Sequence, residues 1–185
     1  MSITTHERPG VYSSYGASSL IRGSGGRKTV GLVAVNTKAT AKTVYTITSY
    51  EEAVTTFGSA GGQDMAELIR VILLNGAAAV AAVPIAADTD YEAGFAVLEG
   101  QENVSVVVCD STTETDQQDL RDSVAAASAA RRERIAVVGG AASETVTNLI
   151  SRAAALNSER VVLVAPGGVD EDGDALSGLT AAAAV

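Results

Sequence analysis

Three short apolar segments in the second half of the chain determine the predicted fold. Residues 104–108, 135–138 and 161–165 are continuous runs rich in valine and isoleucine, with little alternation of polar positions. Runs of this kind are typical of strands that are buried on both faces of a parallel sheet. The segments between them are long enough for crossover helices, which we expect over residues 115–132 and 143–156. The pattern therefore predicts an α/β domain.

Three further strands are expected in the first half of the chain. Residues 29–36 form an apolar run, and residues 77–85 form another that consists largely of alanine and valine. Residues 43–48 alternate between polar and apolar side chains, which indicates a short strand near an edge of the sheet. Together the segments predict a helix-covered, mixed and largely parallel β-sheet core.

The same half of the chain contains clear helix start and stop signals. Ser49 and Glu52 have the spacing of a capping box, which predicts a short helix ending at Phe57. Residues 63–75 carry large apolar side chains at helical spacing, and Gly76 is placed to end that helix. These signals predict two helices between the second and third strands.

Two other helices are predicted from weaker signals. Asp88 or Thr89 can cap a helix that runs to about Glu99. Residues 176–185 resemble the start of an alanine-rich helix. Because that apolar run has no capping residue, we expect the core domain, residues 29–185, to be incomplete at its C-terminus.

Residues 1–28 differ in composition from the rest and are expected to form an N-terminal arm and linker. They are rich in glycine and serine and contain few large apolar groups, so alone they bury too little surface to offset the entropy of ordering. One part combines a Pro-Gly turn with a short strand-like piece. Two interpretations stay open for it: a floppy terminus, or an arm that adds a strand to a sheet edge. The second makes a subunit interface of Arg8, Pro9, Gly10, Val11, Tyr12, Ser13, Ser14 and Tyr15.

Composition and charge narrow the possible functions. The 185 residues fit one domain, or one domain with an arm, and 46% are hydrophobic although only 4% are aromatic. The net charge of −9 argues against a nucleic-acid-binding surface. No apolar run approaches the roughly 20 residues that a membrane span requires, so we expect no membrane anchor.

A phosphate-binding loop and a cysteine nucleophile are both disfavoured. The glycine-rich residues 23–29 carry Arg27 where a phosphate loop requires glycine, and they precede a strand instead of following one. Cys109 ends a predicted buried strand, and the only histidine that could activate it is His6. We therefore interpret Cys109 as a small core residue.

The loops after the strands offer the remaining chemical candidates. Asp110 stands at the carboxyl end of a strand, where open α/β sheets bind ligands, and the Gly139-Gly140 pair follows another strand. We interpret the pair as turn glycines and Asp110 as a loop-capping acid. The carboxylates of residues 170–174 lack the calcium-loop pattern. No catalytic set, cofactor or metal site is expected. A small-molecule-binding or enzymatic domain that uses Asp110, Gly139 and Pro166 remains the alternative.

The order of these features resembles the contractile tail sheath proteins of bacteriophages and related injection systems. Residues 7–15 are similar to the Pro-Gly-Val-Tyr-like arm that opens those proteins, and residues 30–34 are similar to their first strand. Residues 48–58 match a polar cap, an acidic short helix and a closing Phe-Gly. The helix and valine-rich strand of residues 64–84 match the next element. Val164-Ala-Pro-Gly167 and residues 180–185 are similar to a later region of the family.

The resemblance implies a structural protein without catalytic activity. It implies homo-oligomeric stacked rings around a tail tube protein, together with baseplate and tail terminator proteins, whose contraction drives delivery of a genome or an effector into a host cell. The implied location is the tail of a virion or prophage-derived particle, assembled in the bacterial cytoplasm. In this interpretation residues 9–15 donate a strand and residues 16–26 are a flexible hinge.

Overall fold

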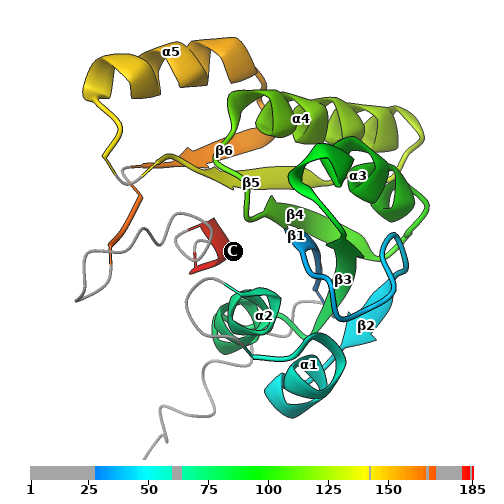
Figure 1. The fold of residues 1–185 in the computed structure, drawn as a ribbon. Coiled ribbons are helices and arrows are strands. Elements are labelled where there is room, and N and C mark those ends of the chain that lie inside the picture. The colour runs from blue at the N-terminus through cyan, green and yellow to red at the C-terminus, as the bar shows by residue number, and fades with distance from the viewer. Residues whose placement is uncertain (1–27, 60–63, 142, 166, 170–180, 184) are drawn as a thin grey trace, which may run out of the picture.

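The computed structural model describes residues 28–59, 64–141, 143–165, 167–169, 181–183 and 185. They form a six-stranded sheet with helices on both faces (Figure 1). The strands are β1 (Thr29–Val35), β2 (Tyr45–Ile47), β3 (Ala79–Ile85), β4 (Val104–Cys109), β5 (Ile135–Gly139) and β6 (Val161–Val164). The helices are α1 (Tyr50–Phe57), α2 (Met65–Leu74), α3 (Tyr91–Glu99), α4 (Glu114–Ala129) and α5 (Val146–Leu156).

The strand order β2-β3-β1-β4-β5-β6 confirms the mixed, largely parallel sheet that the sequence predicts. β1 pairs in parallel with both β3 and β4, and β5 and β6 continue the parallel arrangement. β2 runs antiparallel to β3 at one edge, as its alternating pattern indicates. The parallel strands therefore all begin on one side of the sheet, which we call the amino edge, and all end on the opposite side, which we call the carboxyl edge. The outermost strands β2 and β6 are called end strands.

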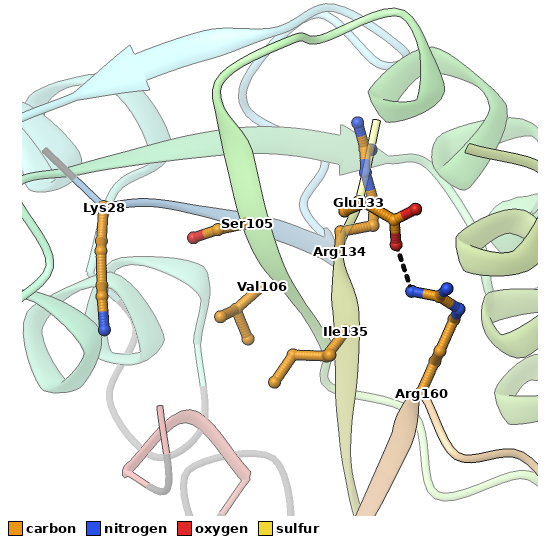
Figure 2. A pocket seen from close by; sticks show the side chains of 7 residues that line it. All are labelled: Lys28, Ser105, Val106, Glu133, Arg134, Ile135 and Arg160. Atoms are coloured by element: carbon orange, nitrogen blue, oxygen red, sulfur yellow. Dashed lines mark hydrogen bonds and ion pairs between the residues drawn. The ribbon is translucent and has the colours of Figure 1, made fainter. Parts of the chain in front are cut away.

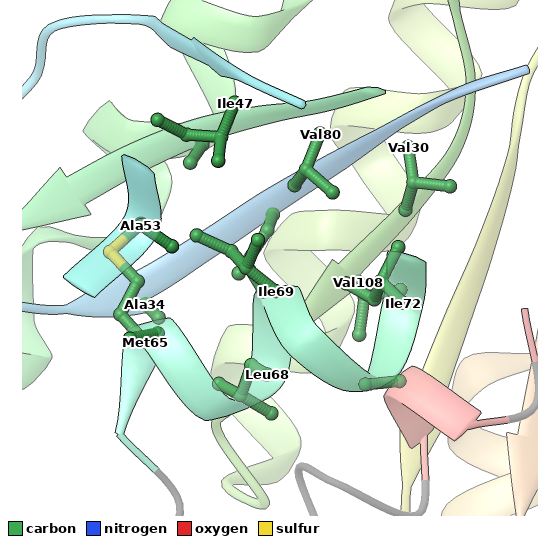
Figure 3. Close-up of a cluster of buried hydrophobic side chains, with 14 of the residues drawn as sticks. Val30, Ala34, Ile47, Ala53, Met65, Leu68, Ile69, Ile72, Val80 and Val108 are labelled. Atoms are coloured by element: carbon green, nitrogen blue, oxygen red, sulfur yellow. The ribbon is translucent and has the colours of Figure 1, made fainter. Parts of the chain in front are cut away.

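One face of the sheet packs against α1 and α2. Side chains of alternate β1 positions, among them Val30 and Ala34, meet Ile69 and Ile72 of α2 in a cluster of fully buried aliphatic groups (Figure 3). Residues 181–183 are helical, and Ala181 of this turn is completely buried in the same cluster. The expected alanine-rich helix of residues 176–185 is thus confirmed at residues 181–183, whereas Val185 is not helical.

The other face packs against α3 and α4, with α5 beyond them over β6 (Figure 1). Val33 of β1 and Val83 of β3 point into this second cluster, together with Phe95 of α3 and Leu120 of α4. Consecutive β1 side chains thus point into hydrophobic clusters on opposite faces of the sheet, which is why the sequence of this strand is a continuous apolar run.

The expectation that all three runs of the second half are buried on both faces is wrong for β6. Val162 keeps 47% of its surface exposed, and Ile135 of the neighbouring β5 keeps 40%. β6 is the end strand of the described sheet and has β5 as its one described neighbour. On the side of α1 and α2, these two positions are therefore left partly open to solvent.

Two predicted helix signals are confirmed in atomic detail. Ser49 Oγ accepts the amide hydrogen of Glu52 at 3.3 Å, although the Glu52 carboxylate accepts from Thr48 N and not from the cap residue itself. Gly76 adopts φ 102°, and its N–H donates to Leu73 O at 3.2 Å. α2 therefore ends because Gly76, which follows it, has a left-handed backbone conformation.

The other helices differ from their predicted bounds. α4 ends at Ala129 because Arg131 adopts a left-handed φ of 63°, and the N–H of Arg132 donates back to Ala127 O at 2.9 Å. This is a Schellman ending without glycine, which the sequence does not reveal.

α5 begins at Val146 and not near residue 143, since Thr145 caps it. A 3-10 turn, Asp88–Asp90, precedes α3.

Residues 1–27 and 170–180 lie outside the described ranges. The division into an arm of residues 1–28 and a core of residues 29–185 therefore stays a prediction. Within the described ranges, no helix has the length and apolar character that crossing a membrane requires.

Close packing of α3 on the sheet predicts that Gly94→Ala destabilises the fold. A Cβ at Gly94 would lie 2.7 Å from Val33 Cγ1 and 2.9 Å from Ile85 Cγ2. Overpacking costs about 1–3 kcal/mol and outweighs the roughly 1 kcal/mol that alanine gains in a helix. We expect a lower urea midpoint at unchanged slope. Gly100→Ala is the control, because its Cβ would meet nothing nearer than Val97 O at 3.9 Å. Equal midpoints for the two variants would contradict the prediction.

Candidate functional site

The predicted subunit interface, residues 8–15, lies outside the described ranges, so its role stays a prediction. The sheet to which a strand from it could be added is described. β2 and β6 are its two end strands, each with one neighbour among the described strands. An end strand directs a row of backbone N–H and C=O groups away from the sheet, and an extended segment can pair with them.

The carboxyl edge of the sheet holds Asp110, directly after β4. Its Oδ1 accepts a hydrogen bond from the Tyr91 hydroxyl at 2.5 Å, and its Oδ2 accepts from Val35 N at the end of β1 at 3.2 Å. Burial raises the pKa of Asp110, and the bond from Tyr91 opposes that rise. Burial likewise raises the pKa of the Tyr91 phenol, assisted by the nearby Asp110 charge. Asp110 therefore joins β1, β4 and α3.

A second polar network connects α4, α5 and the end of β5. The buried Gln117 donates from Nε2 to Gly139 O at 2.8 Å and to Ser111 O at 3.1 Å, and its Oε1 accepts from Arg152 Nη1 at 3.2 Å. Arg152 forms an ion pair with Glu144 at 3.0 Å, with both side chains about nine-tenths buried. The hydrogen bond from Arg152 is the main cause that lowers the pKa of Glu144.

Asp110 and Gly139 are thus each bonded to other groups of the core. Gly140 lies close to α5, since a Cβ there would lie 2.8 Å from Leu149 Cδ2 and that side chain would have to shift. Cys109 is buried, as expected, and burial raises the pKa of its thiol. Pro166 lies outside the described ranges. Within those ranges, no three His, Cys, Asp or Glu side chains are grouped as ligands for a metal ion.

The opposite, amino edge of the sheet carries a pocket that the sequence analysis missed. Its volume is about 300 Å³, and its cationic lining residues are Lys28, Arg134 and Arg160. Each of them directly precedes a strand, β1, β5 and β6 respectively. Because the amino ends of parallel strands share one edge, this recurring position is the sequence signal that predicts the grouping.

Figure 2 shows how the pocket is built. Lys28 and Arg160 stand on opposite sides of an apolar floor formed by Val106 and Ile135. Arg134 is 3% exposed and donates to the backbone oxygens of the chain at the end of α3, Nη1 to Leu98 O at 2.9 Å and Nη2 to Gln101 O at 2.7 Å. Burial lowers the pKa of its guanidinium group. Arg160 is also paired with Glu133.

Exposed apolar side chains gather at the end of the molecule that holds β5, α5 and β6. Of the seven large hydrophobic residues that are exposed within the described ranges, five belong to this end: Ile135, Val146, Ile150, Val162 and Val169. Ile135 and Val162 lie on the α1–α2 side of the sheet, whereas Val146 and Ile150 lie on α5 at the other side, so apolar groups are exposed on both sides of this end. Exposed apolar patches mark surfaces that contact other protein.

No protein-family model and no curated protein sequence matches the chain. Solved structures do match. The helical sheath of the anti-feeding prophage in its contracted state has a TM-score of 0.62 and 17% identity, and the match covers 97% of this chain and 52% of that one. The sheath tail protein of Desulfitobacterium hafniense has a TM-score of 0.63 and 11% identity, with coverages of 94% and 60%. The sheath tail protein of Listeria innocua has a TM-score of 0.61 and 14% identity, with coverages of 90% and 57%.

The chain has the fold of contractile sheath proteins. It spans between half and three-fifths of the length of these three similar structures. The expected α/β class and the resemblance in fold are thereby confirmed. In this sheath fold the carboxyl-edge networks join the elements of the core to one another.

The Glu144–Arg152 pair predicts pH-dependent stability. The pKa of Glu144 is lowered from its ordinary 4.5, so its ionised form stabilises the fold above about that pH. The contribution is lost as the pH falls through the folded-state pKa. At pH 7, Glu144→Gln should reduce the free energy of unfolding by about 1–3 kcal/mol, measured by urea denaturation. Lys42→Gln, which removes an exposed pair with Asp90, should cost at most about 1 kcal/mol. A Glu144→Gln deficit that persists unchanged in acid would contradict the assignment.

Asp110 predicts the opposite dependence. Burial raises its pKa, so the stability it contributes is greatest while it is protonated and falls as the pH rises through the folded-state pKa. In Asp110→Asn that decline should be absent, and the variant should gain on the parent between acid and neutral pH. Unfolding midpoints measured across that range provide the test. Parallel curves for the two proteins would show that Asp110 does not titrate in this way.

Proposed function

We propose that this chain is a structural subunit of a contractile tail sheath, which polymerises around a tail tube and contracts to drive delivery into a host cell. The observation that carries the proposal is the extent of the fold match. Sheath proteins from three sources match over at least 90% of this chain. A similar fold also occurs in the anti-feeding prophage baseplate, with a TM-score of 0.58, 16% identity and coverages of 96% and 51%.

Features of the described surface support an assembling protein. The sheet has two end strands, β2 and β6, and the apolar groups Val146 and Ile150 of α5 are 72% and 65% exposed. In a monomer such groups would stay in contact with water, whereas in a ring they can be covered by a neighbouring subunit. At the carboxyl edge, by contrast, polar groups are hydrogen-bonded to other groups of the same chain.

In the proposed assembly, residues 9–15 donate a strand to the sheet of a neighbouring subunit and residues 16–26 act as the hinge. Strand addition supplies main-chain hydrogen bonds that do not depend on a particular side-chain contact. A flexible linker lets two subunits change their relative orientation without separating. The proposed partners are further copies of the subunit, the tail tube protein, and the baseplate and terminator proteins. The proposed location is the particle tail.

Deletion of residues 1–26 tests the proposal. The deletion is made in the full-length gene product. The variant should form no rings or tubes in negative-stain electron microscopy, either by itself or in the presence of a cognate tail tube. The urea midpoint of the core should stay close to that of the parent, because the described cores use residues from position 30 onwards.

A matched control replaces residues 16–26 with a Gly/Ser segment of equal length, which should preserve assembly because a hinge needs only reach and flexibility. Tubes formed by the deletion variant would refute the role of the arm. A parent protein that forms no rings and does not coat a cognate tube would refute the sheath function. A metabolite recovered at stoichiometric level would favour the alternative of a small-molecule-binding domain.

A further inference from the structure

We propose that the pocket at the amino edge of the sheet binds a carboxylate-bearing, partly apolar segment of a second copy of this chain. The pocket is lined by three cations and one carboxylate, Glu133, and so has a net charge of +2 in a chain whose net charge is −9. It is the place where a carboxylate from another copy would be drawn.

The cations of the pocket are only partly used. Arg160 Nη1 bonds to Glu133, and the two terminal nitrogens of Arg134 are taken by backbone oxygens. Arg134 Nε is buried and has no partner among the described residues. No described residue pairs with the ammonium group of the exposed Lys28. The Lys28 ammonium group is therefore the cation that an incoming carboxylate can reach, while the buried Arg134 adds positive charge beneath it.

A β-bulge adds a further polar group. In the pairing of β1 with β4, Thr29 faces Val104 and Val30 faces Val106, so Ser105 is the extra residue. Consecutive strand residues normally point to opposite faces, yet both Ser105 and Val106 line this pocket (Figure 2). Ser105 Oγ is buried without a hydrogen-bond partner among the described residues. Bulges are over-represented beside functional sites, and a buried hydroxyl without a partner calls for an explanation.

Shape and apolar character favour a protein segment over a free anion. A volume of about 300 Å³ lies at the lower limit for small-molecule sites. The apolar floor extends beyond the pocket onto the exposed sheet face at Ile135 and Val162. A small inorganic anion would leave that surface in water, whereas an acidic residue flanked by aliphatic side chains would cover it and pair with Lys28.

The choice of a second copy as the occupant rests on the proposed function, in which identical subunits lie side by side. The pocket is at the β4–β5–β6 end of the sheet, and a contact between this end and a different surface of the next copy is heterologous. Contacts of that type generate rings or helices when they repeat. With 22 acidic residues against 13 Lys and Arg, each copy has carboxylates to offer.

Carbodiimide cross-linking of mixed ¹⁴N- and ¹⁵N-labelled chains tests the proposal, because this reagent joins an amine to a carboxylate in direct contact. The two preparations are mixed as dilute protein, concentrated to allow assembly, cross-linked and analysed by mass spectrometry. Links from Lys28 should appear in mixed-isotope peptides and should diminish at high salt, which screens the contact. Lys42 is the internal control: it pairs with Asp90 of its own copy at 3.0 Å and should give single-isotope links.

Charge reversal provides the second measurement. Lys28→Glu should remove the mixed-isotope links and weaken self-association in sedimentation velocity about tenfold. Lys42→Glu makes the same change in net charge away from the pocket and should leave association unchanged. If Lys28 links only within one copy, for example to the acidic residues 170–174, the pocket is filled internally and the proposal is wrong. If rings and tubes form as well in Lys28→Glu as in the parent, the sheath function stands and this inference fails.

Discussion

Burial of β1 on both faces is the constraint on which the rest of the fold depends. β1 lies between β3 and β4 and is parallel to both, so the chain winds to one side of it to reach β3 and then crosses to the other side to reach β4. The two connections supply different helices. α1 and α2 cover one face, and α3 covers the other (Figure 1). Gly31 at the centre of the strand keeps the approach close, since a Cβ there would lie 3.0 Å from both Leu98 and Val104.

The reversal of winding at β1 has a consequence for function. In open α/β sheets, the crevice at such a switch point beyond the carboxyl ends is the usual ligand site. Here the ends of β1 and β4 are joined at that point by the Asp110 carboxylate, which accepts from Val35 N and the Tyr91 hydroxyl. The position that enzymes of this class use for a substrate thus serves to fasten two strands and a helix together. The partly unsatisfied polar groups of the described chain lie at the opposite edge.

The sequence predicts the elements well where local chemistry determines them. The cap at Ser49 and the stop at Gly76 could be identified because Ser and Gly have few competing roles at those positions. The end of α4 could not, because Arg131 occupies a left-handed conformation that normally indicates glycine or asparagine. The exposure of Val162 was missed because an apolar run does not distinguish a central strand from an end strand. The pocket depends on a bulge at Ser105, and a bulge arises from pairing between distant segments.

The two edges of the sheet differ in how strongly their charged side chains are bound, and this difference suits the proposed role of a subunit that must change neighbours. At the carboxyl edge, Arg152 and Glu144 are nearly buried and share hydrogen bonds with the backbone, and breaking a pair of that kind costs several kcal/mol. At the amino edge Lys28 is exposed, and an exposed ion pair contributes about 0–1 kcal/mol. The proposed contacts between copies at the amino edge can therefore be broken and formed again by forces that leave the core intact. A sheath that contracts needs this order of strengths, because the subunits must stay folded while the lattice rearranges.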